Sequence, residues 1–315
     1  MGKVKTKPVK NKLTAKKMRR YIPLYLMLLP GAVYLIINNY MPMAGLALSF
    51  KDVNYSIGLF ESPWCGLDNF KYLFATNDAF IFFRNTILYN IAFIILGNAL
   101  GVFVAIALDA IHNKFLKRFS QVIILIPYLL STVIISYIVY AFLSGNNGFL
   151  NMTILPMLGM DPINWYNEAQ YWPVIIVLVY LWMTFGYNSI LYYSTLIGID
   201  KSYYEAASVD GAGVWAQIRY ITLPALRPTI ITLVLLAVGR ICYSDFGLFY
   251  QVTMNSGLLY ETTQTIDTYV YRGLLELNDI GRSTAAGFLQ SILGFICVFT
   301  ANTVVSKIDK DSSLF

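Results

Sequence analysis

One apolar stretch of this chain is interrupted by charged and aromatic residues. Arg240 lies near the middle of the stretch 229–250, and Tyr243, Asp245 and Phe246 follow it. A charge in the middle of a membrane span costs about 2.5–3.5 kcal/mol on insertion scales, so Arg240 implies an ionic partner or a water-filled cavity. Because a guanidinium binds a carboxylate through two parallel hydrogen bonds, an unpaired Arg240 would suit non-covalent recognition of an anionic group.

The helical period predicts which of these side chains act together. Tyr243 and Gly247 follow Arg240 by three and seven positions and share its side of a helix. Asp245 and Phe246 lie nearer the expected external end of the span. In the last apolar stretch, Gln290 is the most polar deep position. The alternative is structural: Arg240 pairs with an acidic group on another subunit, and the tyrosines serve as packing.

The composition requires a membrane around these residues. The chain has 315 residues, of which 57% are hydrophobic and 13% are charged, and its mean hydropathy is +0.59. These values lie far from those of soluble domains. A span needs about 20 apolar residues, so we predict an all-α polytopic membrane protein with six transmembrane helices. The six predicted spans are 22–50, 85–108, 122–142, 172–196, 229–250 and 284–305.

The first predicted span is the longest and contains three prolines, Pro23, Pro30 and Pro42. Proline removes a backbone donor and clashes with the preceding turn. We therefore expect this span to kink, or to end near Asn38 and continue along the membrane interface.

Lysine and arginine set the predicted orientation, because they are retained on the cytoplasmic side. If both termini are cytoplasmic, the cytoplasmic segments contain 17 of the 23 basic residues. We therefore divide the chain into a basic cytoplasmic tail, 1–20, which anionic lipid headgroups attract, and a transmembrane domain, 21–315. The loop 201–228 then faces the cytoplasm.

That loop has local signals of its own. Ser202 and Glu205 have the spacing of a capping box, which predicts a short helix that starts there and contains the small residues Ala206 and Ala207.

The second half of the loop begins with a predicted reversal. Gly211 and Gly213 break the first helix and permit a tight turn. A second short helix around Trp215 follows, and Pro224 and Pro228 close the element before the next span.

The order of these residues resembles the EAA loop of bacterial ABC-importer permeases. The residues that match are Glu205, Ala206, Ala207, Asp210, Gly211, Leu223 and Pro224. The resemblance implies that the loop docks into a groove of a separate ATPase subunit and passes its ATP-driven closure to the membrane helices. Relatives commonly have a proline before the loop helix, where this chain has Asp200.

Outer motifs resemble the oligosaccharide and polysaccharide branch of this family, which includes the maltose permease. They comprise residues 28–31, residues 64–70 and residues 181–188. The resemblance implies the type I ABC-importer architecture and places substrate contacts at Tyr187 and Asn188. Sugar sites combine aromatic faces, which stack on the ring, with polar groups that bond hydroxyls. Arg240, Tyr243 and Gln290 would supply such groups.

The resemblance also implies partners and a location. The chain would pair with a second permease, as a heterodimer, below an extracellular solute-binding protein and above two copies of an ATPase. ATP and magnesium would bind to the ATPases, and the assembly would lie in the bacterial cell membrane. The substrate would be an oligosaccharide, possibly acidic.

Other functions find less support in the sequence. There is no P-loop pattern, and Cys65, Cys242, Cys297 and the single histidine, His112, lack metal-ligand spacing. We therefore expect no enzyme activity, no cofactor or metal bound by this chain, and no nucleic-acid partner. A stand-alone secondary transporter or channel is the main alternative, but it predicts inverted repeats or several intramembrane carboxylates. A membrane enzyme would need clustered acidic or histidine residues at one interface.

Overall fold

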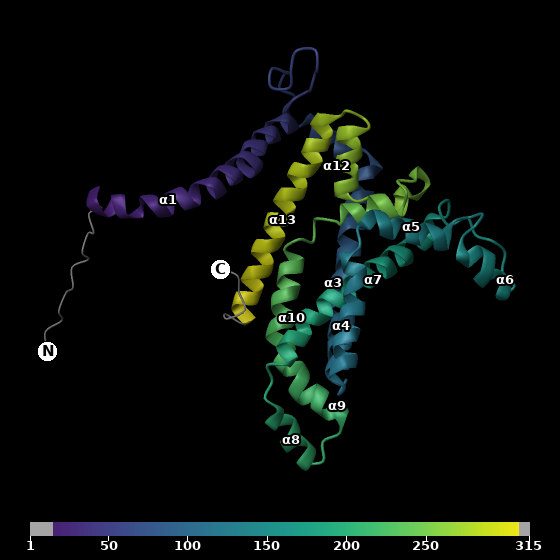
Figure 1. The fold of residues 1–315 in the computed structure, drawn as a ribbon. Helices are drawn as coiled ribbons and strands as arrows, with labels where there is room; N and C mark the ends of the chain where they lie inside the picture. Colours follow the sequence, from purple (N-terminus) through teal and green to yellow (C-terminus); the bar gives the residue numbers. More distant parts are fainter. Residues whose placement is uncertain (1–14, 309–315) are drawn as a thin grey trace.

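The computed structural model describes residues 15–308, and these form a helical assembly (Figure 1). Residues 1–14, the first part of the predicted basic tail 1–20, lie outside the described residues. Within the described part the one strand-like pairing is an isolated bridge between Lys51 and Trp64. The α-helices are α1 (Ala15–Leu35), α2 (Asp68–Ala75), α3 (Asn77–Asp109), α4 (Lys114–Leu129), α5 (Thr132–Leu143), α6 (Leu155–Met157), α7 (Trp172–Leu196), α8 (Lys201–Val209), α9 (Val214–Gln217), α10 (Leu223–Val238), α11 (Tyr260–Thr263), α12 (Ile266–Leu275) and α13 (Ile280–Ile308).

The predicted count of six spans is confirmed if one bent helix pair is counted as a span. Five helical segments are long and apolar enough to cross a membrane: Tyr21–Phe50, Asn77–Asp109, Ala169–Leu196, Val214–Val238 and Ile280–Lys307. The sixth consists of α4 and α5, which meet at 94°. The predicted span 122–142 lies within this bent pair, and its start is wrong, because α4 begins at Lys114.

Two local features explain this bend. Leu130 has an extended backbone, with ψ of 141°, directly after α4. The Ser131 side chain then caps α5 by accepting a hydrogen bond from the amide of Ile134 at 3.4 Å. Hydropathy measures how apolar a segment is and not the direction of its helix axis. The bend between α4 and α5 therefore cannot be detected from it.

The fifth predicted span, 229–250, is also wrong in its position. The apolar helix begins at Val214 and α10 ends at Val238. A Cβ on Gly239 would come within 3.3 Å of the Val298 side chain in α13, so the chain passes close to that helix where α10 ends. Residues 239–242 form a turn and residues 243–245 are irregular, and we refer to 239–245 together as the turn. Arg240 lies in this turn and not in the middle of a helix.

The first span changes geometry close to the predicted position. The α-helical part ends at Leu35, a π-helical turn covers Ile36–Tyr40, and a 3-10 segment continues over Met41–Phe50. The helix therefore changes type close to Asn38, but it does not end there, because Tyr21–Phe50 remains one continuous helical segment. Helix α1 extends away from the other helices in Figure 1, and its described side chains are almost all exposed.

Helices α3 and α7 form the centre of the assembly. Small residues allow them to approach, because a Cβ on Gly101 would lie 3.0 Å from Asn188 and 3.2 Å from Tyr192. Gly186 does the same for α4, since a Cβ there would lie 1.8 Å from the carbonyl oxygen of Ile124. Small residues at crossing points are the usual means of packing helices in membranes.

Candidate translocation cavity and coupling loop

A cavity of about 510 Å³ lies where α10 ends and the chain turns. Helices α3, α7 and α10 each contribute to its wall, and the turn with the residues just after it completes the wall. The lining residues are Asn90, Phe93, Ile94, Tyr180, Ala237, Arg240, Tyr243, Ser244, Asp245, Phe246 and Gly247. Four predicted path residues, Arg240, Tyr243, Asp245 and Phe246, are therefore brought together, although the helical period invoked for them does not apply.

Side-chain amides hold the turn in place. The Nδ2 group of Asn90 in α3 donates to the carbonyl oxygens of Ile241 and Tyr243, both at 3.0 Å. The Nε2 group of Gln290 in α13 donates to the carbonyl oxygen of Cys242 at 2.8 Å. A helix that breaks inside a membrane leaves carbonyl groups without partners, and such breaks persist only where other groups satisfy them. Three successive carbonyls of this turn are satisfied in this way.

A carboxylate that sequence reasoning missed completes the support. Oδ2 of Asp267 in α12 accepts hydrogen bonds from the amide and the hydroxyl of Ser244, both at 2.7 Å. Its Oδ1 accepts from Gln290 at 3.1 Å. We call Asn90, Asp267 and Gln290 the turn clamp. Gln290, predicted as a substrate contact, has its amide nitrogen engaged in this clamp and is 5% exposed.

Because of the turn clamp, we expect Gln290→Leu to lower the stability of the folded protein. Leucine leaves the Cys242 carbonyl and one Asp267 oxygen without the donor they share. Each buried polar atom without a hydrogen-bond partner costs about 1–3 kcal/mol. We expect a lower thermal unfolding temperature of the purified protein. The control is Ser291→Ala, because the Ser291 hydroxyl is exposed and bonds only within its own helix, to the Gly287 carbonyl. Equal unfolding temperatures for the two variants would contradict the clamp.

Arg240 is exposed to the cavity. Its guanidinium makes no hydrogen bond or ion pair with any residue that the structure describes. Asp245 lies on the same wall, and its Oδ1 accepts a hydrogen bond from the amide of Leu248 at 3.1 Å. The cavity therefore offers one free cation and one partly engaged carboxylate.

Helix α7 contributes to the cavity through Tyr180, not through the two residues predicted from it. The Tyr180 ring stacks on Phe93, with centroids 3.7 Å apart and an angle of 11° between the planes. Tyr187 stacks instead on Tyr128 of α4, with centroids 4.5 Å apart. Asn188 packs against Gly97 and Gly101 of α3. No local signal in the sequence distinguishes Tyr180 from the other tyrosines of α7.

An aromatic cluster continues from the cavity wall. The Phe246 ring lies 5.0 Å from that of Tyr250 and 4.6 Å from that of Tyr271 in α12. The Tyr250 hydroxyl donates to Glu276 at 3.3 Å. Ring faces next to polar groups are the combination that binds sugars.

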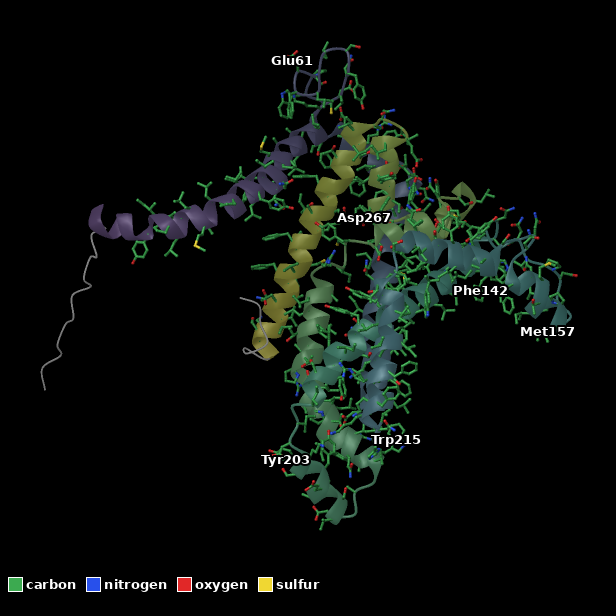
Figure 2. The ribbon with its side chains drawn as sticks, in the orientation of Figure 1. Glu61, Phe142, Met157, Tyr203, Trp215 and Asp267 are labelled. Carbon is green, nitrogen blue, oxygen red and sulfur yellow. The ribbon has the colours of Figure 1, made fainter. Side chains whose placement is uncertain are left out.

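At the opposite end of the molecule lie α8 and α9, whose Tyr203 and Trp215 are labelled in Figure 2. The predicted capping box is wrong. Helix α8 begins at Lys201, and its cap is Asp200, whose Oδ1 accepts from the amide of Ser202 at 2.9 Å. That hydrogen bond holds the pKa of Asp200 below its ordinary value. Asp200 thus starts the helix.

Removal of this cap is expected to loosen α8. Asp200→Ala should cost about 1 kcal/mol of helix stability and should raise the hydrogen-exchange rates of the first amides of α8. Asp200→Asn, which retains an accepting oxygen, and Lys201→Ala, in the exposed first turn, serve as controls. Unchanged exchange in the alanine variant would show that Asp200 does not stabilise the helix.

The reversal predicted at Gly211 is confirmed. Gly211 has φ of +80°, a conformation that favours glycine. The amide of Ala212 donates to the carbonyl of Ala207 at 2.8 Å, and that of Gly211 donates to the carbonyl of Ser208 at 3.1 Å. These two bonds form a Schellman motif, which ends α8 and sets the direction of the chain.

The second half of the loop differs from the prediction. Pro224 and Pro228 do not close the element, because α9, a π-helical turn at Ile218–Thr222 and α10 form one apolar helical segment, Val214–Val238. Pro224 lies in the first turn of α10 and Pro228 lies inside it. The π-helical turn ends two residues before Pro224, which has no amide hydrogen to donate.

Two side-chain contacts fix α8 against this helical segment. Gln217 donates to the Ser208 hydroxyl at 2.9 Å, and the Tyr204 and Thr222 hydroxyls lie 3.0 Å apart. Glu205, Ala206 and Asp210 lie on or at the end of α8, and Leu223 and Pro224 begin α10.

The loop exposes a large apolar surface. The most exposed side chains are Tyr203, Val209, Val214, Trp215 and Tyr220, between 64% and 88% exposed. Exposed apolar patches of this kind mark sites of contact with another protein or with the membrane. No group of three histidine, cysteine, aspartate or glutamate residues among the described residues could hold a metal ion.

Comparison with known proteins identifies the family. Residues 97–310 match the family described as the inner membrane component of binding-protein-dependent transport systems. Protein LplB of Bacillus subtilis (strain 168) is 33% identical over 91% of this chain and 90% of its own length. YteP of the same organism, a polygalacturonan/rhamnogalacturonan transport system permease, is 30% identical over 91% of this chain and 89% of its own length.

A solved structure agrees with these relatives. It is a bacterial ABC transporter involved in the import of the acidic polysaccharide alginate, and the matched chain is 30% identical, with a TM-score of 0.85 over 93% of this chain and 98% of that chain. A second structure of a bacterial alginate ABC transporter, in complex with a periplasmic protein bound to an alginate pentasaccharide, has a TM-score of 0.84 over 95% of this chain and 99% of that chain. The chain belongs to the family of inner-membrane permease components of binding-protein-dependent transport systems.

Proposed function

We propose that this chain is the permease subunit of an ATP-driven importer for an acidic oligosaccharide. Two relatives support the substrate class, since one is named for polygalacturonan and rhamnogalacturonan and the other for alginate. All three names denote polymers that contain uronic acids. The oligosaccharide enters from an extracellular solute-binding protein and passes through the cavity beside Arg240.

The free guanidinium of Arg240 is the observation that carries the substrate class. It binds the carboxylate of a uronate residue through two hydrogen bonds. Asp245 accepts hydrogen bonds from sugar hydroxyls, and the stacked Tyr180 and Phe93 border the space in which a sugar ring lies. We retain Arg240, Tyr243, Asp245 and Phe246 as substrate-path residues and add Tyr180.

Tyr187, Asn188 and Gln290 remain in the proposal with indirect roles. Tyr187 and Asn188 lie on faces of α7 that pack against α4 and α3, and Gln290 supports the turn through the clamp. They shape the path through these contacts and do not bind the saccharide themselves.

The loop 201–228 couples transport to ATP hydrolysis on partner subunits. Its exposed apolar surface and the rigid α8–α9 reversal fit a docking site for an ATPase, with Glu205, Ala206, Ala207, Asp210, Gly211, Leu223 and Pro224 at the joint. ATP and magnesium bind to two copies of that ATPase, and this chain performs no hydrolysis. A second permease completes the path as a heterodimer.

The orientation follows from the distribution of basic residues. Both termini and the loop 201–228 are cytoplasmic, 1–20 is a basic tail, and 21–315 is the transmembrane domain in the bacterial cell membrane. The turn clamp and the loop 52–64 then belong to the outer half of the molecule.

Affinity purification of the tagged chain from its native membrane tests the assembly. We expect mass spectrometry to find a second permease and an ATPase, and mild cross-linking to add a solute-binding protein. Recovery of the folded chain alone would overturn the importer and would favour a stand-alone transporter.

The substrate class is tested with the purified complex in nanodiscs. Oligouronates and neutral oligosaccharides of the same length are added with the binding protein, and ATPase stimulation and uptake are measured. Stimulation by the oligouronates alone supports the proposal. Stimulation by the neutral series alone would show that Arg240 does not select an acidic sugar.

A further inference from the structure

A groove of about 450 Å³ lies between α3 and α7, toward the end of the molecule that is opposite α8 and α9 (Figure 1). Both helices begin at that end, and α11 borders the groove there. The lining residues are Arg84, Asn85, Leu88, Tyr89, Ala92, Pro173, Val177, Glu261 and Thr262. None of them lines the translocation cavity or belongs to the loop 201–228.

The groove faces away from the translocation cavity. Arg84, Leu88 and Ala92 follow one another at intervals of four and form a stripe along one side of α3. Asn90 and Phe93, which line the cavity, lie on the other side of the same helix by its period. Leu88 is 58% exposed. Because a second permease is proposed to complete the path on the cavity side, the stripe faces the membrane.

The groove is apolar along its length and charged at one end. Leu88, Ala92 and Val177 supply apolar side chains to its wall. Arg84 lies two turns after the start of α3, and α7 begins at Trp172 beside it, so the charge is at the level of a membrane interface. A phospholipid has the same order, with a charged phosphate above an apolar chain. Basic pockets between transmembrane helices are known to bind such headgroups.

Hydrogen bonds hold the Arg84 side chain in place without neutralising it. Its Nε and Nη2 donate to Oδ1 of Asn85 at 3.2 and 3.0 Å, and Nη2 also donates to the carbonyl oxygen of Glu261 at 2.7 Å. Both acceptors are neutral, and no carboxylate in the described part of the chain lies within ion-pair distance of Arg84. A guanidinium has five N–H donors, and the Nη1 group bonds to none of the described residues.

We propose that this groove binds one zwitterionic phospholipid, with its phosphate on Arg84 and one acyl chain along the groove. Arginine matches the geometry of phosphate, because its planar group donates two parallel hydrogen bonds. Glu261 also lines the groove, and its exposed residue supplies a carboxylate for the ammonium of a phosphatidylethanolamine headgroup. The site goes beyond the proposed function and requires only that α3 and α7 span a membrane. The proposed orientation places it in the outer leaflet.

Native mass spectrometry of the purified protein measures this binding. The delipidated protein is titrated with dioleoyl phosphatidylethanolamine and, for comparison, with dioleoylglycerol, which lacks the phosphate headgroup. We expect Arg84→Gln to raise the concentration for half occupancy of the tightest phospholipid site about tenfold. Lys71→Gln is the control, because it removes a charge from an exposed ion pair with Asp68 at the same end of the molecule. It should leave the concentration unchanged.

A second variant fills the groove and retains Arg84. Ala92→Phe places a large side chain where the acyl chain would lie, and it should also weaken phospholipid binding about tenfold. Its control is Ala99→Phe, the same substitution at an exposed position of α3 two turns beyond the groove. This pair keeps the proposal testable if Arg84→Gln does not fold.

Several results would overturn the lipid site. They are unchanged phospholipid binding in Arg84→Gln or Ala92→Phe, and binding of dioleoylglycerol as tight as that of the phospholipid. Tighter binding of phosphatidylglycerol would overturn the zwitterionic headgroup. Loss of the second permease from Ala92→Phe would make the groove an interface between proteins. These measurements do not depend on transport, so failure of the proposed importer, seen as a folded chain that purifies alone, is distinct.

Discussion

Gly211→Val is expected to lower saccharide uptake by at least about tenfold while the protein still inserts and assembles. The left-handed backbone at Gly211, with φ of +80°, costs an ordinary residue about 1–2 kcal/mol, and a β-branched residue is strained most. Because no atom lies within 4 Å of a Cβ at this position, the effect arises from the backbone and not from a clash. Relief of this strain would rotate α8 away from α9 and separate the two halves of the surface that we propose docks the ATPase.

Two variants control this result. Gly213→Val adds the same side chain in open space two residues later, where φ is −70°, and should retain uptake. Gly211→Asn adds a side chain of similar size that tolerates the left-handed conformation, and it should retain more uptake than valine. Uptake and ATPase activity are measured on the same proteoliposomes. If Gly211→Val and Gly213→Val transport equally well, the backbone at Gly211 has no role in coupling.

The second large effect is expected for Arg240→Gln. Glutamine retains polarity but removes the charge, and a hydrogen bond to a charged group contributes about 1.5–3 kcal/mol. This loss corresponds to a half-saturation concentration for an oligouronate that is about 10- to 150-fold higher. Uptake of a neutral oligosaccharide, if the complex accepts one, should change much less.

The measurement is the concentration dependence of uptake, with assembly checked for each variant by co-purification of the second permease. Arg240→Lys should restore part of the affinity, because it supplies the charge without the planar pair of donors. If Arg240→Gln instead loses the second permease, Arg240 forms an ionic pair in the assembly. The substrate role would then be wrong.

The sequence determined the membrane class, the family and the reversal in the loop 201–228 through local signals. Apolar length requires a span wherever it occurs, and the glycine at 211 is needed because its backbone is left-handed. The start of α8 was predicted within two residues, because the cap proved to be Asp200 and not Ser202. These features depend on a few consecutive residues, so a single sequence contains them.

The cavity could be predicted only in part. Arg240 was recognised because a charge in an apolar stretch is costly, and this argument holds wherever the helix ends. Its helical neighbours were chosen from a period that stops at Val238. Tyr180 was missed because hydropathy does not tell which face of α7 borders the space beside α10.

Only the tertiary structure decided where α10 ends and what holds the turn after it. Asn90 and the carbonyl of Ile241 that it bonds are 151 positions apart, and Gln290 lies 48 positions from Cys242. Asp267, which fixes Ser244, has no feature in its own segment that indicates this role. A helix can stop within an apolar stretch when distant amides satisfy its free carbonyls. That condition depends on the packing of α3, α12 and α13 around the turn, and no local pattern of residues expresses it.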